Sequence, residues 1–342
     1  MKAMVLRKVV NLEVDNSPLQ LVYMNKPVPG EREILVRVSR CGVCHTELDE
    51  IEGRTPPSCF PIILGHQIVG KVERTGRETR RFEEGERIGI AWIHSACGEC
   101  NFCRSGKENL CDKFMATGRD AHGGYAEYTV VLEDFAYAIP RTFSDSEAAP
   151  LLCAGAIGYR SLMRAEIEDG ESIGLTGFGA SGHLVLGILQ HKYPRSKVFV
   201  FSRTLSERVF AAELGAYWTG DTEEKSPETL HAVIDTTPAW KPLANALRNL
   251  EKGGRLVINA IRKEERDKES LLGLEYSRDL WEEKEIKSVA NITRKDVEEF
   301  LALAAEIPLK PEIQEFPLAE ANQALRELKQ RKIRGAKVLR IE

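Results

Sequence analysis

The chain has 342 residues, of which 42% are hydrophobic and 29% are charged, and its formal net charge is −4. This length is enough for two domains with separate cores, and the composition is that of an ordinary globular protein. The slightly negative charge, without any basic block, argues against nucleic acid as a partner. The first residues carry charges and no long apolar run, so we expect neither a signal peptide nor a membrane span and predict a cytoplasmic location.

Short strands separated by Gly and Pro are predicted for the first 140 residues. Alternating or apolar runs of strand length occupy residues 34–40, 67–73, 87–93 and 125–131. No long helical periodicity lies between them. The pattern predicts a β-rich domain over residues 1–150.

Four cysteines follow these strands with the spacing C-x2-C-x2-C-x7-C, and they are Cys97, Cys100, Cys103 and Cys111. Thiolates that converge within one short loop form the closed tetrahedral cage that a structural zinc ion prefers. An iron–sulfur cluster is the competing metal, but the ferredoxin-type run has a shorter last gap followed by Pro. A disulfide pair is disfavoured, because nothing else indicates an oxidising compartment.

Strand and helix alternate after Pro150. Strand-like runs occupy residues 171–177, 197–203, 231–237 and 254–260, with helical stretches at 183–192, 206–216 and 242–252 between them. Such alternation predicts a doubly wound parallel sheet covered on both faces, over residues 151–289.

The last part of the chain, residues 290–342, does not continue this alternation. It contains a helical pattern at 296–307, a strand at 312–316, a helix at 318–330 and a strand at 337–342. We expect this tail to return and pack with the first domain.

A G-x-G-x-x-G motif, formed by Gly177, Gly179 and Gly182, lies between the first strand and the first helix of the alternating region. In that context the first glycine makes the turn, the second lets a pyrophosphate approach, and the third lets helix and strand pack closely. The helix N-terminus adds partial positive charge for the phosphates. The motif therefore predicts a dinucleotide site, and a purely structural glycine turn is the alternative.

The residues at the end of the next predicted strand, 197–203, indicate which dinucleotide is bound. The strand end carries Ser202 and Arg203, with Arg208 one turn into the following helix, where an acidic residue would accept the adenosine ribose diol. A small hydroxyl and a guanidinium suit a ribose 2′-phosphate. We therefore expect NADP(H) in preference to NAD(H), unless these arginines are only solvated residues at the helix start.

A second metal site can be built from Cys44, His66 and Cys153. Two thiolates and one imidazole neutralise Zn²⁺ and leave a fourth position open, as a catalytic site requires. On spacing alone this grouping is open, since lone cysteines at strand ends are often small buried hydrophobes.

Together these motifs resemble the zinc-containing alcohol dehydrogenases of the medium-chain dehydrogenase/reductase superfamily. The resemblance spans nearly the whole chain through CGVCHTEL, ILGHQIVG, the four-cysteine segment, GGYAEYTV, LLCAGAIGY, GFGASG and ITRKD. It implies an α/β protein with a GroES-like catalytic domain, residues 1–150 and 290–342, and a Rossmann domain, residues 151–289. It also implies two zinc ions per chain, with Cys44, His66 and Cys153 as the catalytic ligands. By the same resemblance, His45 and Arg294 contact the cofactor pyrophosphate.

Residues beside the catalytic ligands would then move the proton and orient the metal. Thr46 can accept the hydroxyl proton, and Glu47 can fix the imidazole of His66, although both could instead cap a helix. The chain departs from the family at Gln67, which replaces a glutamate, and at Asp49, where several relatives carry a histidine. We expect the first change to affect zinc exchange more than hydride transfer.

The substrate is less well determined by the sequence. Trp92 and Ile93 occupy positions that line the substrate cleft in relatives, although plain core is the alternative. We expect a zinc-dependent alcohol dehydrogenase or aldehyde reductase for a small alcohol or carbonyl compound. The alternatives are an NAD-dependent alcohol or polyol dehydrogenase and a non-catalytic dinucleotide-binding protein. The strand at 254–260 is expected at the sheet edge, where relatives join their sheets, so a homodimer or homotetramer is predicted.

Overall fold

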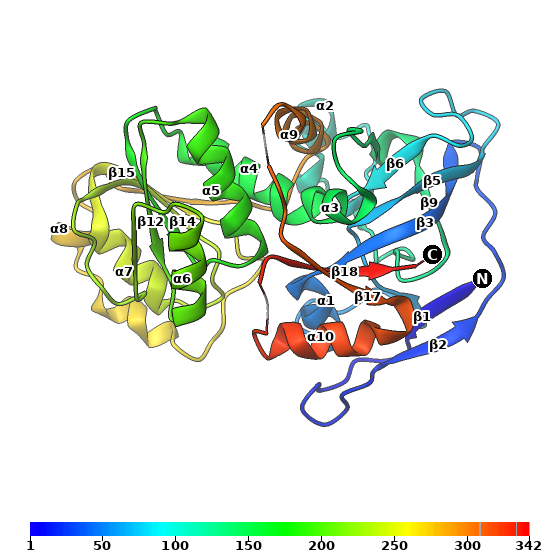
Figure 1. Cartoon of the computed structure of the whole chain (residues 1–342), viewed down its shortest axis with the longest axis horizontal. Coiled ribbons are helices and arrows are strands. Elements are labelled where there is room, and N and C mark those ends of the chain that lie inside the picture. The colour runs from blue at the N-terminus through cyan, green and yellow to red at the C-terminus, as the bar shows by residue number, and fades with distance from the viewer. Residues whose placement is uncertain (308, 333, 342) are drawn as a thin grey trace. The chain divides into compact units, whose positions relative to one another are not determined.

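The structure is a computed structural model that describes residues 1–307, 309–332 and 334–341, with its elements labelled in Figure 1. The chain forms two compact units. Unit 1 consists of Met1–Cys153, Ile292–Glu306 and Lys310–Glu342, and unit 2 consists of Ala154–Asn291 and Ile307–Leu309.

Unit 1 is built on a mostly antiparallel sheet of seven strands whose centre is the long strand β3 (Glu33–Val43). On one side of β3 follow β5 (Ile68–Thr75), β6 (Arg87–Ile90) and β10 (Ala136–Ala138). On the other side are β18 (Ala336–Arg340) and β17 (Ile313–Pro317), and β9 (Tyr128–Leu132) pairs with the first half of β3. Because β18 pairs antiparallel with β3, the end of the chain completes the sheet begun near its start (Figure 1). Residue 342, the last of the predicted strand 337–342, lies outside the described residues.

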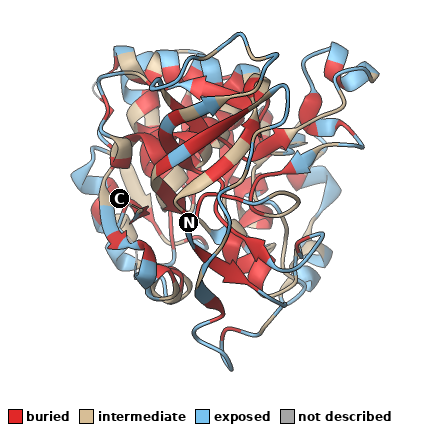
Figure 2. Cartoon of the chain, turned by 90° about the vertical axis from the view of Figure 1, so that its right-hand side faces the viewer, coloured by how far each residue is buried: buried red, intermediate tan, exposed pale blue. Residues whose placement is uncertain are grey.

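Two smaller sheets and several helices complete unit 1. The sheets are β2 (Leu19–Tyr23), β1 (Lys2–Leu6) and β4 (Ile62–Ile63), and the pair β7 (Ile93–Ser95) and β8 (Met115–Ala116). The helices are α1 (His45–Ile51), α2 (Asn101–Arg104), α3 (Asp145–Pro150), α9 (Arg294–Glu306) and α10 (Ala321–Lys329), with short 3-10 turns at Glu108–Leu110, Glu133–Phe135 and Leu318–Glu320. Figure 2 shows many buried residues in the strands and many exposed residues in the loops around them. The outer strands β2 and β17 are less buried than the central ones.

Unit 2 contains a six-stranded sheet in which every paired strand runs parallel to its neighbour. Its strand order is β13 (Trp218–Gly220), β12 (Lys197–Phe201), β11 (Ser172–Thr176), β14 (Leu230–Asp235), β15 (Leu250–Ile258) and β16 (Glu285–Ser288). The connecting helices are α4 (Ala156–Ala165), α5 (Ala180–Lys192), α6 (Leu205–Glu213), α7 (Lys241–Asn249) and α8 (Tyr276–Asp279), with a 3-10 turn at Lys268–Gly273. This is the 3-2-1-4-5-6 order of a dinucleotide-binding fold, so the predicted α/β class is confirmed.

One expectation about this sheet is wrong. The strand predicted at 254–260 is not at the edge, because β15 lies between β14 and β16. The edge strand on this side of the sheet is β16, whose four residues EIKS include two charged side chains and a single large apolar one. So short and polar a strand gives almost no periodic signal, and it acquires its strand conformation by pairing with β15.

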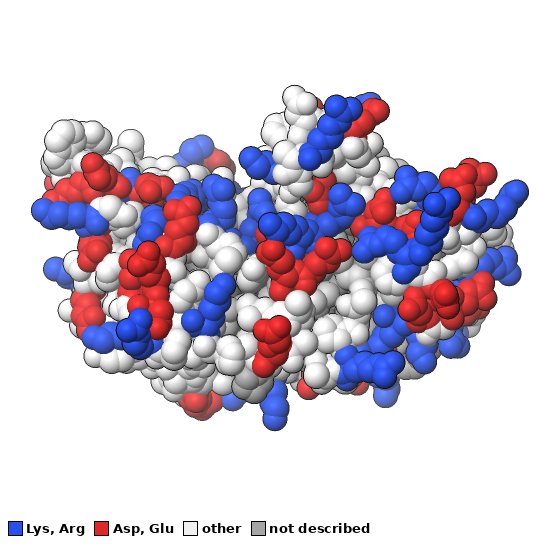
Figure 3. All heavy atoms as spheres, turned by 90° about the horizontal axis from the view of Figure 1, so that it is seen from above, with Lys and Arg blue, Asp and Glu red and all other residues white. Residues whose placement is uncertain are grey.

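Charges of both signs are interspersed on the face shown in Figure 3. Among the residues that the structure describes, none of the helices combines the length and apolar character needed to cross a bilayer.

Candidate active site

Three predicted metal ligands from separate parts of unit 1 meet at one point. Cys44 follows β3, His66 precedes β5, and Cys153 lies in a π-helical turn, Leu151–Gly155, that follows α3. Their ligand atoms all lie within 4.8 Å of one another, and Nε2 of His66 is 3.3 Å from Sγ of Cys153. Such π-turns often occur at functional sites.

The backbone beside His66 is held by close packing. Gly65 has φ +95°, and a Cβ there would lie 2.4 Å from the ring of Tyr125 and 2.8 Å from Sγ of Cys41. No other residue fits this position without a shift of these neighbours. Gly65 therefore determines where the imidazole of His66 is placed.

A buried carboxylate orients that imidazole. Oε1 of Glu47 lies 2.7 Å from Nδ1 of His66, and neither side chain is exposed. Oε2 of Glu47 accepts the backbone N–H of Cys44 at 2.7 Å, which closes a capping box at the start of α1. Glu47 thus engages Nδ1 and directs Nε2 of His66 toward the two thiols.

The electrostatics of the cluster favour a thiolate at Cys44. A hydrogen bond from Cys153 lowers the pKa of the Cys44 thiol well below its usual range despite burial, and His66 lowers it further. Hydrogen bonding with Cys44, together with burial, raises the pKa of the Cys153 thiol, and the Glu47 carboxylate raises the pKa of the His66 imidazole despite its burial. A thiolate is the form of cysteine that binds metals. Two sulfurs and one imidazole nitrogen form a zinc-type donor set with one coordination position left for another ligand.

Three of the residues predicted beside the ligands, His45, Thr46 and Asp49, lie on helix α1 directly after Cys44. Thr46 is half-buried, with Oγ1 3.4 Å from Sγ of Cys44, and His45 is exposed at the start of α1. The helix cap is Cys44 itself, whose sulfur accepts the N–H of Thr46, so Thr46 is not the capping residue. Asp49 accepts a 2.5 Å hydrogen bond from Nε of Arg54.

Gln67 is buried and packs over Gly42, where a Cβ would lie only 2.3 Å from Oε1 of the glutamine. The backbone N–H of Gly42 also donates to the carbonyl of Gln67 at 2.9 Å. The glutamine amide is therefore fixed beside β3, next in sequence to His66.

The two residues predicted to line the substrate cleft, Trp92 and Ile93, are both buried in the main core of unit 1. The indole of Trp92 packs against Phe114, with ring centroids 5.1 Å apart, and the guanidinium of Arg119 lies 5.5 Å from its ring. Nε1 of Trp92 has no hydrogen-bond partner among the described residues.

The four-cysteine segment forms a second, separate cluster. Sγ of Cys97 lies 3.5 Å from Sγ of Cys111 and 3.8 Å from Sγ of Cys103, and all four sulfurs lie within 4.8 Å of one another. Hydrogen bonds from the backbone N–H groups of Glu99 and Cys100 lower the pKa of the Cys97 thiol to about 6. Four converging sulfurs fit a closed tetrahedral zinc site.

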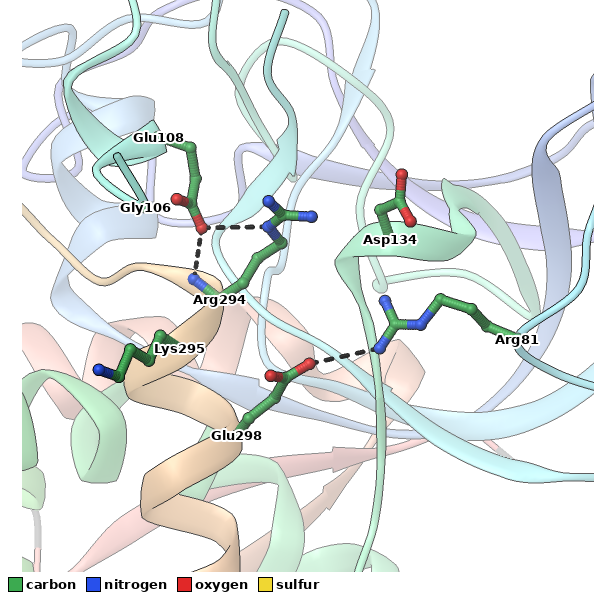
Figure 4. A pocket seen from close by; sticks show the side chains of 7 residues that line it. All are labelled: Arg81, Gly106, Glu108, Asp134, Arg294, Lys295 and Glu298. Atoms are coloured by element: carbon green, nitrogen blue, oxygen red, sulfur yellow. Dashed lines mark hydrogen bonds and ion pairs between the residues drawn. The ribbon is translucent and has the colours of Figure 1, made fainter. Parts of the chain in front are cut away.

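Arg294, the first residue of α9, is bound to the segment that carries these cysteines. Its backbone N–H and Nε both donate to Oε1 of Glu108, at 2.7 and 3.2 Å, and its guanidinium lies 5.2 Å from the ring centroid of Phe135. Figure 4 shows this pair beside a pocket of about 360 Å³, together with the ion pair between Arg81 and Glu298.

The glycine motif of unit 2 forms the turn between β11 and α5. Gly177 has φ +84°, and a Cβ on Gly182 would lie 2.9 Å from the carbonyl oxygen of Gly177. A Cβ on Gly179 would meet no heavy atom within 4 Å, so the space over this residue is open. The turn, the close helix approach and the open backbone fit a dinucleotide pyrophosphate.

Glu207 lies at the predicted ribose site and was not among the residues predicted from the sequence. Ser202 is 3% exposed, and its hydroxyl donates to Oε2 of Glu207 at 2.5 Å. Arg203 is exposed, and Arg208 lies 3.4 Å from Asp221. In the sequence, Thr204 and Glu207 have the spacing of a capping box. This pattern predicts the start of a helix and gives no indication that Glu207 lies at a ligand site.

Family models match two parts of the chain. Residues 30–141 match the alcohol dehydrogenase GroES-like domain, and residues 211–339 match the zinc-binding dehydrogenase model. A probable alcohol dehydrogenase AdhA of Mycobacterium tuberculosis is 39% identical over 333 residues, 96% of this chain and 94% of that protein. An alcohol dehydrogenase of Geobacillus stearothermophilus is 31% identical over 344 residues, 98% of this chain and all of that protein.

Solved structures are similar over the whole chain. A thermostable alcohol dehydrogenase from Pyrobaculum aerophilum has a TM-score of 0.87 at 25% identity and covers 100% of this chain and 99% of its own. A cinnamyl alcohol dehydrogenase from Sorghum bicolor has a TM-score of 0.85 at 24% identity, over 99% of this chain and 97% of its own, which supports the fold alone.

Proposed function

The chain belongs to the zinc-containing alcohol dehydrogenases of the medium-chain dehydrogenase/reductase superfamily, and from this membership we propose that it transfers hydride between NADP(H) and a small alcohol or carbonyl compound. Oxidoreduction of alcohols with zinc and a nicotinamide dinucleotide follows from the family. The preference for NADP(H) and a role as aldehyde reductase are our proposals. One observation carries the active-site assignment, namely the convergence of Cys44, His66 and Cys153 with Nδ1 of His66 engaged by Glu47.

Cys44, His66 and Cys153 would hold the catalytic zinc. When bound, this ion supplies Lewis-acid polarisation of the substrate oxygen, and the nicotinamide supplies or accepts the hydride. Thr46, beside the Cys44 sulfur, is placed to accept the hydroxyl proton of an alcohol and pass it on. Asp49 is engaged by Arg54, so we propose that the proton leaves through the exposed His45 or through solvent. Trp92 and Ile93 remain proposed walls of the substrate site.

Two properties support the proposed cofactor-binding residues, namely the open backbone at the glycine turn and the positive charge of nearby arginines. Gly177, Gly179 and Gly182 would take the pyrophosphate, and the exposed Arg203 would take a ribose 2′-phosphate, with Arg208 nearby. Glu108 accepts from the backbone N–H and Nε of Arg294, and neither terminal nitrogen of this guanidinium forms a hydrogen bond or ion pair with a described residue. We therefore propose that Arg294 contacts a phosphate of the cofactor. The exposed His45 is proposed as a second phosphate contact.

A second, structural zinc is proposed for Cys97, Cys100, Cys103 and Cys111, which gives two ions per chain. We also propose a homodimer or homotetramer joined along β16. In support, β16 is the last strand of its sheet, and exposed apolar side chains, among them Ile286 and Trp281, lie on it and just before it. The alternative of a non-catalytic dinucleotide-binding protein is not retained, because all three open-site ligands are present and close together.

Initial rates of NADPH and NADH oxidation with a panel of short aldehydes and ketones test this function. Zinc-replete protein should turn over and prefer NADPH. Turnover with a preference for NADH would overturn the cofactor proposal and keep the activity. Absence of turnover with either dinucleotide, in protein that contains two zinc ions per chain, would contradict the proposed substrate class.

A further inference from the structure

We infer that Glu207 is a cofactor-discriminating residue whose carboxylate opposes a phosphate on the 2′ position of the adenosine ribose and accepts a hydrogen bond from a free 2′-hydroxyl. The inference rests on the proposed binding of a dinucleotide at the turn between β11 and α5. Arg203 by itself favours the 2′-phosphate of NADP(H), whereas the negative charge of Glu207 opposes that phosphate.

Glu207 lies where the adenosine ribose is expected. The end of β12 is joined to the glycine turn by a 2.8 Å hydrogen bond from the N–H of Gly177 to the carbonyl of Phe201. Ser202 follows directly, and its hydroxyl donates to Oε2 of Glu207 while accepting the N–H of Thr204 at 3.2 Å. Because the hydroxyl hydrogen of Ser202 is already given to Glu207, this serine has no donor left for a phosphate.

The charge of Glu207 is not neutralised within the described residues. No described cation forms an ion pair with it, whereas the nearby Arg208 is engaged by Asp221 and Glu224 at 3.4 and 3.8 Å. Arg203 is exposed and also has no ion-pair partner among the described residues. The end of β12 therefore presents one uncompensated cation and one uncompensated carboxylate.

These two charges favour different dinucleotides. A 2′-phosphate is attracted by Arg203 and repelled by Glu207, whereas a ribose hydroxyl can donate to the second oxygen of Glu207. The hydrogen bond to Ser202 holds the carboxylate in place, so it cannot easily turn away from a phosphate. The site is thus expected to admit both dinucleotides, with Glu207 limiting the preference for NADP(H).

Calorimetric titration with 2′,5′-ADP and 5′-AMP tests the inference, because these ligands differ only in the 2′-phosphate. Glu207→Gln keeps an acceptor oxygen for Ser202 and removes the charge. It should tighten 2′,5′-ADP about tenfold and leave 5′-AMP unchanged or weaker. Glu213→Gln, at the other end of α6, is the matched control and should change neither Kd by more than about twofold. Glu207→Ala serves as a second variant, and the ratio of kcat/KM for NADPH and NADH should move in the same direction.

The outcomes separate this inference from the proposed function. An unchanged ratio of the two Kd values in both Glu207 variants, with 2′,5′-ADP weakened by Arg203→Ala, would overturn the role of Glu207 alone. No effect of either residue would show that the ribose binds elsewhere and would overturn the cofactor placement as well. A wild-type protein that binds 5′-AMP more tightly, with the ratio still shifted by Glu207→Gln, would overturn only the NADP(H) preference.

Discussion

At the scale of single residues, the Glu47 carboxylate determines how His66 is presented. It engages Nδ1 of the imidazole from a fully buried position and is itself held by the backbone N–H of Cys44. Such partners fix the tautomer and the orientation of a metal-binding histidine. The Glu47 side chain therefore orients His66 and also takes part in the capping box at the start of α1, directly after Cys44.

We expect Glu47→Gln to weaken zinc binding at the Cys44 site by about 10- to 100-fold, because it removes the negative charge that lies 2.7 Å from Nδ1 of His66. Chelator competition followed by metal analysis measures this loss. The ion held by the four cysteines is the internal control and should be retained. Unchanged affinity at the Cys44 site would show that Glu47 does not position His66.

Cys44→Ser should reduce the zinc content from two ions to one per chain and lower kcat by at least about 1000-fold, while dinucleotide binding is preserved. Cys41→Ser is the matched control three residues away. Burial raises the pKa of the Cys41 thiol well above its usual value, so Cys41 remains a protonated, non-ligating group. Activity that survived in Cys44→Ser would contradict the assignment of the catalytic metal.

At the scale of elements, the four-cysteine segment has little regular structure of its own. Between Cys97 and Cys111 it contains only the four-residue helix α2 and one 3-10 turn. Its link to α9 is the bond between Glu108 and Arg294. We therefore expect this segment to depend on the proposed zinc ion for a defined conformation.

Cys103→Ser should therefore release the structural ion and open this segment to proteases. Limited proteolysis, with cleavage sites located by mass spectrometry, should show new cuts between residues 97 and 113. Arg294→Ala, which removes the bond from Nε to Glu108 without touching a sulfur, should cause a smaller increase in cleavage. Equal resistance of Cys103→Ser and wild type would mean that the segment is stable without its metal.

The short helix α8 carries a pH-dependent contribution to the stability of unit 2. Hydrogen bonds from Arg278 lower the pKa of Asp279, and the N–H of Glu275 acts in the same direction. Because the folded pKa lies below the unfolded value of about 3.9, the stabilisation is fully present above that pH and is lost as the pH falls through the folded value. Asp279→Asn removes this dependence.

Urea unfolding at pH 7 and at pH 3 tests this expectation. Asp279→Asn should be less stable than wild type at pH 7 and should lose less free energy of unfolding between the two conditions. An equal loss in both proteins would show that Asp279 does not contribute to acid sensitivity.

At the scale of the whole molecule, the exposed edge strand β16 is the proposed contact between subunits of a homodimer or homotetramer. Within the described part of the chain, its backbone pairs with a neighbouring strand on one side only, and the side chain of Ile286 on it is 46% exposed. An unprotected edge with apolar side chains is suited to pairing with a second copy of the chain.

Ile286→Lys should shift the protein toward monomer, because a charge buried at the joined edge is unfavourable. Light scattering coupled to size-exclusion chromatography measures the mass. Leu272→Lys alters a side chain that is 89% exposed and outside β16, and it serves as the control. A monomeric wild type, or an assembly unchanged by Ile286→Lys, would contradict association through this edge.

The sequence by itself determined the features whose signals are local. The alternation of strand and helix after Pro150 indicated the parallel sheet, and the α/β class was confirmed by the strand order of unit 2. The four-cysteine spacing and the glycine turn were also visible, because their members lie within a few residues of one another. A thiolate cage or a phosphate-binding turn needs only a short stretch of chain with the right residues.

The tertiary structure decided what depends on contacts between distant residues. Only folding brings Cys153 to 3.3 Å from His66, 87 residues earlier in the chain, and only side-chain packing turns Glu47 toward that imidazole and Ser202 toward Glu207. The edge of the unit 2 sheet was predicted wrongly for the same reason, since β16 has little strand propensity and forms by pairing with β15. Periodicity and spacing report what one segment prefers, whereas edges, orientations and charge pairs are set by the neighbours that the fold supplies.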